Sequence, residues 1–350
     1  MRGKRISVIV IYFILFLTFY NIPIFAGGAV ENLALTHIKG KKFVVLKAAT
    51  NNPKTSGHYR GLQIFKRYVE ERTNGEVRVE LYSDAVLGDE EQMIERMQIG
   101  TVDIMMAASA KYANFVPEMD IYSPPYTFKN WAHYKAVADS PIEEKLQRVV
   151  MERTGDYYLG LFTDGVRNIF SRKPIRTLSE LKGIKLRTMT GPNETHSFRA
   201  LGTNPIPMAY TELYAALKSG FVEAAENTMT SILGMKFYES CKYILRTEHN
   251  FLALPFFISR KAIDKVPVPH KETVLKAGRD TVKEQIDLAI RMDQENEEIL
   301  KKQFGIIIFE LSREDKEKAI ELCLPVQDEN AKRIKMELEL ILIRELAKKY

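Results

Sequence analysis

The stretch Gly183-Ile-Lys-Leu-Arg-Thr-Met-Thr190 carries the pattern that decides the fold. Apolar and basic side chains alternate within it, and the Gly191-Pro192 pair that follows is a typical loop signal. The pattern predicts a short strand that delivers Arg187 to the mouth of a sheet. A guanidinium is permanently charged, and its planar fork of donors matches a carboxylate. Arg187 is therefore the first candidate for binding an organic acid, against the alternative of an ordinary surface ion pair.

Strands and helices alternate in the chain before this stretch. Polar residues that could contact a ligand, Asn51, Glu90 and Ser109, fall just after strands or in loops that lead to helices. This order implies parallel strands with right-handed crossovers, and such sheets bind ligands beyond the carboxyl ends of their strands. The expected strands are residues 43–46, 77–81 and 104–107, and the helices between them include one that Asp89 caps and Gly100 ends.

A second lobe is expected to begin near residues 163–165. The apolar run 251–258 is then long enough to return to the first lobe as one strand. Residues 271–303 favour a single helix, and roughly 33 residues at 1.5 Å each span close to 50 Å, more than one small domain. Helices are expected around 313–322 and 325–349, and an apolar stripe on the last predicts packing on the second lobe, through Leu338, Ile341, Leu342 and Leu346.

These patterns predict an α/β chain with two lobes and a connecting helix. The first lobe is assigned to residues 41–164 and 253–292, and the second to residues 165–252 and 293–350. The helix at about 271–303 would brace both lobes.

Residues 1–29 have the layout of a secretory signal peptide. Three basic residues precede an apolar run and a group of small residues. The run is shorter than the ~20 residues that a membrane-spanning helix needs, and no cysteine follows it to accept a lipid. We expect a soluble, exported, periplasmic protein, with an uncleaved anchor as the alternative. Removing Arg2, Lys4 and Arg5 with no acid lowers the formal charge from +6 to about +3, which does not suggest a nucleic-acid partner.

The sequence lacks the common signatures of enzymes and metal sites. It has no dinucleotide or phosphate loop, no zinc-protease motif and no serine-hydrolase motif. The six histidines are scattered singly. Cys241 and Cys323 have no partner at metal-finger spacing, so they form either a disulfide or two separate buried thiols. We expect no catalytic residues, no metal and no cofactor, although an exported enzyme that acts on a carboxylate stays an alternative.

Four blocks resemble the solute-binding (DctP-type) subunits of tripartite ATP-independent periplasmic (TRAP) transporters. They are Leu87-Gly-Asp-Glu-Glu-Gln-Met93, Gly183-Ile-Lys-Leu-Arg187, Ala200-Leu-Gly-Thr-Asn-Pro-Ile-Pro-Met208, and Glu212-Leu-Tyr-Ala-Ala-Leu217 running on to Glu226-Asn227. The resemblance extends from about residue 43 to about residue 309. It implies a two-lobed periplasmic binding protein fold with an interlobe cleft and a domain-spanning helix.

The same resemblance implies a function. The chain would be the exported receptor of a secondary importer, closing over a small organic acid and delivering it to membrane permease subunits. The family default is a monomer. A ligand sensor that presents the closed form to a membrane signalling protein is the alternative that the residues do not exclude.

The resemblance also implies ligand-binding residues. In related proteins an arginine holds the ligand carboxylate, a second arginine lies one strand earlier, an asparagine donates to the same carboxylate, and an aromatic ring lines the pocket. First-lobe positions contact the rest of the ligand, unless they serve only as a loop cap and a helix-start charge. The matching residues are Arg187, Arg167, Asn227, Tyr210, Asn51 and Glu90.

Several positions depart from the family pattern. Thr190 stands where sialate-binding members carry an asparagine, and Ala108 where they carry an acid, so sialic acid is disfavoured. Glu223-Ala224 replaces the usual Asp-Gly. Lys111 occupies a position where arginine is common, which leaves room for a different distal group. A dicarboxylate, a keto acid or a sugar acid fits, and the sequence does not choose among them.

Overall fold

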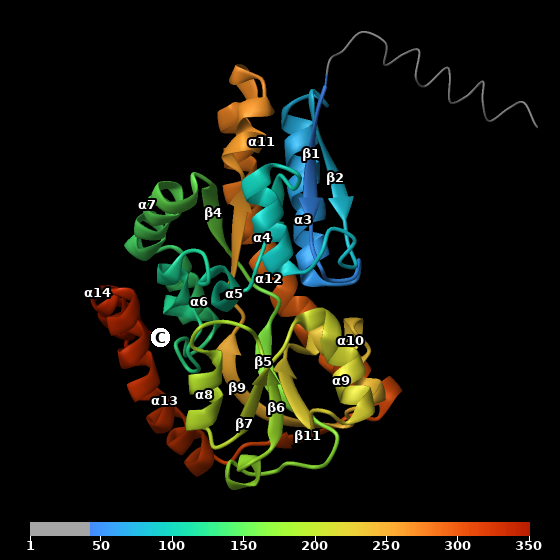
Figure 1. The fold of residues 1–350 in the computed structure, drawn as a ribbon, viewed down its shortest axis with the longest axis vertical. Helices are drawn as coiled ribbons and strands as arrows, with labels where there is room; N and C mark the ends of the chain where they lie inside the picture. Colours follow the sequence, from blue (N-terminus) through green and yellow to red (C-terminus); the bar gives the residue numbers. More distant parts are fainter. Residues whose placement is uncertain (1–42) are drawn as a thin grey trace, which may run out of the picture. The chain divides into compact units, whose positions relative to one another are not determined.

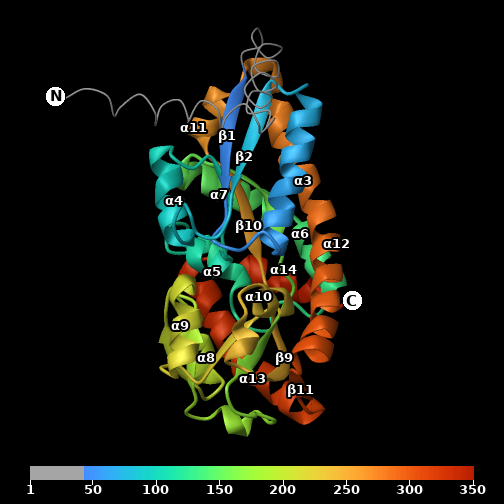
Figure 2. The same cartoon turned by 90° about the vertical axis from the view of Figure 1, so that its right-hand side faces the viewer.

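The computed structural model describes residues 43–350, so the predicted signal peptide lies outside the described residues. Residues 44–350 form one compact unit that contains two sheets (Figures 1 and 2). One sheet has five strands in the order β2-β1-β3-β10-β4, and the other has six in the order β11-β9-β5-β8-β6-β7. We call the part built on the five-stranded sheet the first lobe and the part built on the six-stranded sheet the second lobe.

The first lobe is mainly a parallel sheet, as the alternation of strands and helices predicts. Strand β1 pairs in parallel with β2 and β3, whereas β10 runs antiparallel to β3 and β4. The elements are β1 (Val44–Ala49), α3 (Gly57–Arg72), β2 (Val77–Tyr82), α4 (Glu90–Ile99), β3 (Ile104–Met106), α5 (Ser109–Tyr112), α6 (Trp131–Ala138), α7 (Pro141–Thr154), β4 (Tyr157–Phe162), β10 (Leu254–Ile258) and α11 (Arg260–Lys265).

The start of α4 confirms a local prediction from the sequence. The Asp89 side chain accepts a hydrogen bond from the Gln92 backbone, and the Gln92 side chain accepts one from the Asp89 backbone. Gly100 ends the helix in the left-handed conformation, with φ of 83°. This capping box fixes Glu90 in the first turn, at the carboxyl-end rim of the sheet.

In the second lobe, strand direction brings three polar residues to one edge. Strands β6, β7 and β8 are parallel, so Arg187 and Asn227 lie at neighbouring carboxyl ends. Strand β5 runs antiparallel to β8, which places Arg167, near its amino end, at the same edge. The elements are β5 (Val166–Ser171), β6 (Lys185–Thr188), α8 (Glu194–Ala200), β7 (Asn204–Pro207), α9 (Leu213–Ser219), β8 (Ala224–Asn227), α10 (Met229–Gly234), β9 (Tyr243–Phe251) and β11 (Ile307–Glu310).

Several segments cross between the lobes, among them residues 163–165, which join β4 of one sheet to β5 of the other. The predicted single strand over residues 251–258 is wrong, because β9 ends at Phe251 in one sheet and β10 begins at Leu254 in the other. Helix α12 (Lys271–Phe304) contacts α3 and β4 of the first lobe and α10 of the second (Figure 2). Within α12, the Gln285 amide accepts from the Thr163 nitrogen at 3.0 Å and donates to its carbonyl oxygen at 2.5 Å. This helix therefore braces the crossing between the lobes.

The C-terminal helices differ from the prediction. Helix α13 (Arg313–Ile334) continues through Pro325 and ends at Lys335, whose φ is +57°. The turn there shifts the buried face of α14 (Glu337–Ala347): Leu340 and Ile343 are buried in a core cluster of the first lobe, whereas Leu338 is 76% exposed. The predicted packing of this last helix on the second lobe is therefore wrong.

Two further observations concern the described residues. Cys241 and Cys323 are separate buried thiols. Among the helices of residues 43–350, none is both long and apolar enough to cross a membrane.

A buried acid in the first lobe makes stability depend on pH. The Glu143 carboxylate of α7 accepts hydrogen bonds from the Tyr122 and Tyr158 hydroxyls, each at 2.6 Å. Burial raises the pKa of Glu143 from 4.5 to about 7, although both hydroxyls act in the opposite direction. The folded state therefore retains a proton that the unfolded state loses, so this stabilisation is complete below about pH 4.5 and disappears as the pH rises through about 7.

We expect Glu143→Gln to reduce the loss of unfolding free energy between about pH 5 and about pH 8, because the amide does not ionise. Urea unfolding of the parent and the variant across this range measures the change. Glu144→Gln, at an exposed position of the same helix, is the control. A variant with the same pH dependence as the parent would contradict the role of Glu143.

Candidate ligand-binding site

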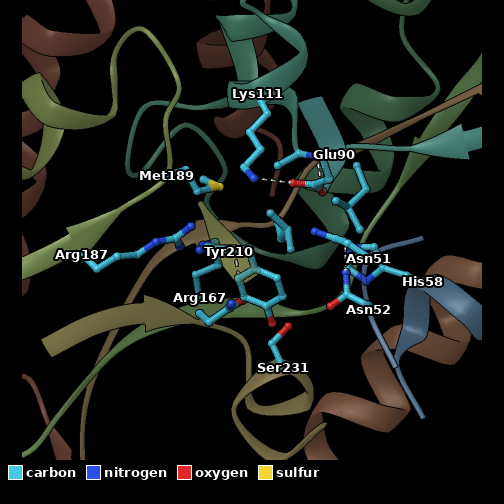
Figure 3. A pocket seen from close by; sticks show the side chains of 14 residues that line it. Asn51, Asn52, His58, Glu90, Lys111, Arg167, Arg187, Met189, Tyr210 and Ser231 are labelled. Carbon is cyan, nitrogen blue, oxygen red and sulfur yellow. Dashed lines mark hydrogen bonds and ion pairs between the residues drawn. The ribbon is translucent and has the colours of Figure 1, made fainter. Parts of the chain in front are cut away.

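A narrow cavity lies between the two lobes, with about 30 Å³ of space that the centre of a water-sized sphere can reach (Figure 3). The structure brings all six residues singled out from the sequence together around it. The cavity is lined by Asn51, Asn52, His58, Glu90, Ala108, Lys111, Arg167, Arg187, Met189, Tyr210, Asn227, Ser231, Leu252 and Leu254.

Arg187 carries a buried charge on the second-lobe side of the cavity. Its side chain is 1% exposed, and its Nε and Nη2 atoms donate to the carbonyl oxygen of Met208 at 3.1 and 2.7 Å. No Asp or Glu in residues 43–350 forms an ion pair with it, and burial lowers its pKa, with Glu226 opposing and Arg167 adding to the shift. An anion in the cavity would offset the cost of burying this charge.

Arg167 differs from Arg187 because its charge is already paired. It forms a two-point ion pair with Glu226, in which Nη2 lies 2.5 Å from Oε1 and Nε bonds to Oε2. Burial alone would lower its pKa, but Glu226 outweighs that effect and the pKa is raised. Both groups are buried, so the pair is a fixed neutral unit beside Arg187. The sequence gives Arg187 the leading role and Arg167 a supporting one, and the structure adds that only Arg167 is paired with an acid among residues 43–350.

Glu226 was quoted in the sequence only as part of a family block, without a role. Burial tends to raise the pKa of this carboxyl, yet Arg167 and His249 lower it to about 2. A buried arginine is costly unless an acid pairs with it. The glutamate next to the candidate Asn227 was therefore the sequence signal that could have identified the partner of Arg167.

Asn227 and Tyr210 complete the second-lobe wall. The Asn227 Oδ1 atom accepts from Arg167 Nη1 at 3.1 Å and from the Thr228 nitrogen at 2.9 Å. These two bonds fix the amide, so its nitrogen is the group left to donate to a ligand. The Tyr210 ring lies 5.8 Å from the Arg187 guanidinium carbon and packs edge-on against Phe237.

The first-lobe wall offers a donor and a neutral ion pair. Asn51 uses its Oδ1 atom to accept from Asn52 at 2.8 Å, while its own amide nitrogen is buried and has no hydrogen-bond partner in the described part of the chain. Glu90 accepts from the Ala108 nitrogen at 3.1 Å and pairs with Lys111 at 3.2 Å. Burial tends to raise the pKa of Glu90, but Lys111 and His58 lower it overall. Lys111 therefore belongs to the site, although the sequence analysis did not place it among the six.

A second buried acid, Glu194, sits at the start of α8. Burial, reinforced by Glu226, raises its pKa to about 8, although Arg167 and Arg187 oppose the shift. Ionising Glu194 is therefore harder than ionising an exposed glutamate, and within residues 43–350 its carboxyl forms no ion pair with Arg187. Among residues 43–350, Arg187 is therefore the cavity cation that is not paired with an acid.

The arrangement of two lobes around a charged cavity agrees with the sequence family. The DctP family model, described as bacterial extracellular solute-binding protein, family 7, matches residues 48–333. The chain belongs to this family. It is a solute-binding protein of the TRAP type, not an enzyme.

Solved DctP-family structures share the fold. A TRAP periplasmic solute-binding protein from Sulfitobacter, solved with bound alpha-D-taluronate, is 27% identical with a TM-score of 0.82 and covers 86% of this chain and 97% of that one. A sugar acid binding protein from Advenella mimigardefordensis, in complex with galactonate, is 27% identical with a TM-score of 0.82 and covers 88% and 99%. A solute-binding protein of Verminephrobacter eiseniae is 32% identical over 63% of this chain and 66% of that protein.

Proposed function

We propose that this DctP-family protein captures a sugar acid, a monocarboxylate with several hydroxyl groups, in the cavity between its lobes. It would do so in the periplasm, as a monomer, and deliver the ligand to the permease subunits of a TRAP importer. The observation that carries the choice of ligand is the charge balance of the cavity. Arg187 has no acidic partner among residues 43–350, whereas Arg167 is paired with Glu226 and Lys111 with Glu90.

The single unpaired positive charge that residues 43–350 place at the cavity matches one carboxylate. The ligand carboxylate would take the free edge of Arg187, with the Asn227 amide nitrogen and Arg167 on the same side of the cavity. Because Arg187 is already oriented by the Met208 carbonyl, little side-chain freedom is lost on binding.

The far end of the cavity suits hydroxyl groups. A hydroxyl both donates and accepts, and this end offers the Asn51 amide nitrogen as a donor and the Lys111–Glu90 pair as donor and acceptor together. A second ligand carboxylate would instead lack a counter-charge there, because Lys111 is already paired with Glu90. A dicarboxylate, one of the ligands that the sequence leaves open, is therefore disfavoured. The sugar acids bound by the two solved relatives have the favoured chemistry.

Closure follows from the placement of these groups on opposite lobes. The ligand would bridge Arg187 and Asn227 of the second lobe to Asn51 and Glu90 of the first, and so bind the closed form better than the open form. That difference in affinity is what shifts the population toward closure.

Mass spectrometry of the acid that co-purifies with the protein, followed by calorimetry, tests this function. D-Galactonate and D-galacturonate are expected to bind and to be recovered unchanged, at least about tenfold more tightly than succinate or malate. Stronger binding of the dicarboxylates would overturn the choice of a sugar acid. Chemical conversion of the bound acid would contradict a pure binding role.

The substitution Glu90→Gln is expected to reduce the preference for sugar acids over dicarboxylates. The amide still accepts from the Ala108 nitrogen, but Lys111 becomes a second unpaired cation. Succinate and malate should then gain roughly tenfold in affinity relative to galactonate. Glu95→Gln, at an exposed position of the same helix, is the control for calorimetry. An unchanged ratio in Glu90→Gln would show that Glu90 does not select against a second carboxylate.

A further inference from the structure

Strand β6 ends at Thr188. The three residues that follow, Met189–Gly191, lie against the first lobe, and we call them the strap. Each residue makes a different contact with the first lobe. Met189 is buried in an apolar cluster of the first lobe that includes Ala108 and Ala110, and it also lines the cavity. The Thr190 hydroxyl donates a hydrogen bond to the Glu91 carboxylate of α4. The strap thus crosses from one lobe to the other beside the ligand cavity.

Gly191 makes the closest of these contacts. A Cβ atom at this position would lie 2.6 Å from the carbonyl oxygen of Ala110 and 2.7 Å from its Cβ atom. Both Ala110 atoms are fixed by the backbone of α5, so no flexible side chain can move away. Gly191 is not among the residues with positive φ, and its backbone conformation is therefore open to other residues. Glycine is required here because the two lobes come so close at Ala110 that no side chain fits between them.

The strap is also joined to the carboxylate site through the chain. Only Thr188, the last residue of β6, separates Arg187 from Met189. Fixing the Arg187 guanidinium on a ligand therefore fixes the end of β6 and the start of the strap. Ligand capture and closure of the cavity are properties of one short segment.

We propose that Met189–Gly191 acts as a closing strap, whose fit on Ala110 and Glu91 holds the lobes together over the bound acid and sets how fast the acid leaves. This inference rests on the proposed function. It assigns Thr190 and Gly191 as positioning residues that do not contact the ligand.

Gly191→Ala is the direct test, with D-galactonate as the probe. The new methyl group would clash only when the lobes meet, so the dissociation rate measured by stopped-flow fluorescence should rise at least about tenfold. The association rate should change by less than about threefold, because the open form is unaffected. Thr190→Val, which removes one hydrogen bond and keeps the shape, should raise the dissociation rate by roughly fivefold. Parental dissociation rates in both variants would overturn the proposal.

Gly234→Ala is the matched control. Gly234 of the second lobe also faces the first lobe, but a Cβ atom there would lie 3.4 Å from Pro53 and 3.6 Å from Thr55, at ordinary contact distances. Its dissociation rate should equal that of the parent. The melting temperature of each ligand-free variant checks that the lobes are folded.

If the parent protein does not bind galactonate, the proposed function fails but the strap is still untested. A second measurement therefore tests the strap without any ligand. Spin labels at Glu95→Cys in α4 and Arg199→Cys in α8 report the distance between the lobes in the ligand-free chain. We expect Gly191→Val to shift that distribution to longer distances than in the labelled parent. An unchanged distribution would overturn the strap.

Discussion

Replacing Arg187 with alanine is expected to weaken binding of the sugar acid by more than a hundredfold, which corresponds to ~3 kcal/mol or more. The reason is that the ligand carboxylate would remain buried in the closed cavity without its cation. The effect should exceed that of removing a surface arginine, because Arg187 is 1% exposed and has no acidic partner in residues 43–350. Calorimetry with D-galactonate, or with the acid that co-purifies, measures the loss.

Two further variants show whether the fork geometry or only the charge matters. Arg187→Lys keeps the charge but lacks the planar fork that forms two parallel hydrogen bonds to one carboxylate, so it should also bind poorly. Arg199→Ala, at an exposed position of α8, is the control and should bind like the parent. If Arg187→Ala bound as tightly as the parent, the carboxylate would have to be held elsewhere.

Features set by neighbouring residues could be predicted from the sequence. The capping of α4 by Asp89 and its end at Gly100 depend on a few adjacent positions, and the structure confirms both. The span of α12 follows from a long run without proline or a strong stop signal, and it ends within one residue of the predicted position. The strand pattern indicated Arg187, Asn51 and Glu90, and the family resemblance added Arg167, Asn227 and Tyr210. The structure gathers all six around one cavity.

Features set by distant contacts could not be predicted in the same way. The pairing of Arg167 with Glu226 depends on the register between β5 and β8, in which Asn168 faces Asn227. The buried face of α14 depends on the turn at Lys335, because a left-handed residue between two helices changes the phase of the second. The contact between Gly191 and Ala110 joins residues about eighty positions apart and exists only when two lobes meet.

The ion pair beside Arg187 gives the largest expected effect on stability. Glu226→Gln removes the counter-charge of Arg167 and leaves two buried guanidinium groups side by side. Breaking a buried pair from one side typically costs ~3–5 kcal/mol, and we expect a loss of that size in the unfolding free energy of the ligand-free protein. Urea unfolding at pH 7 measures it. Glu317→Gln, in the exposed pair with Arg313, should cause no measurable loss.

The ligand should offset part of this loss, and that distinguishes a site residue from an ordinary core residue. A carboxylate placed at Arg187 also faces Arg167 in the variant, so D-galactonate should raise the unfolding midpoint of Glu226→Gln more than that of the parent.

Glu194 could ionise and replace the missing charge, because part of its raised pKa comes from Glu226 itself. The double variant Glu194→Gln/Glu226→Gln removes that compensation and should be the least stable of the set. Parental stability in this double variant would mean that the charge of Arg167 is balanced by a group other than these two acids. The assignment of Arg187 as the unpaired cavity cation of residues 43–350 would then have to be withdrawn.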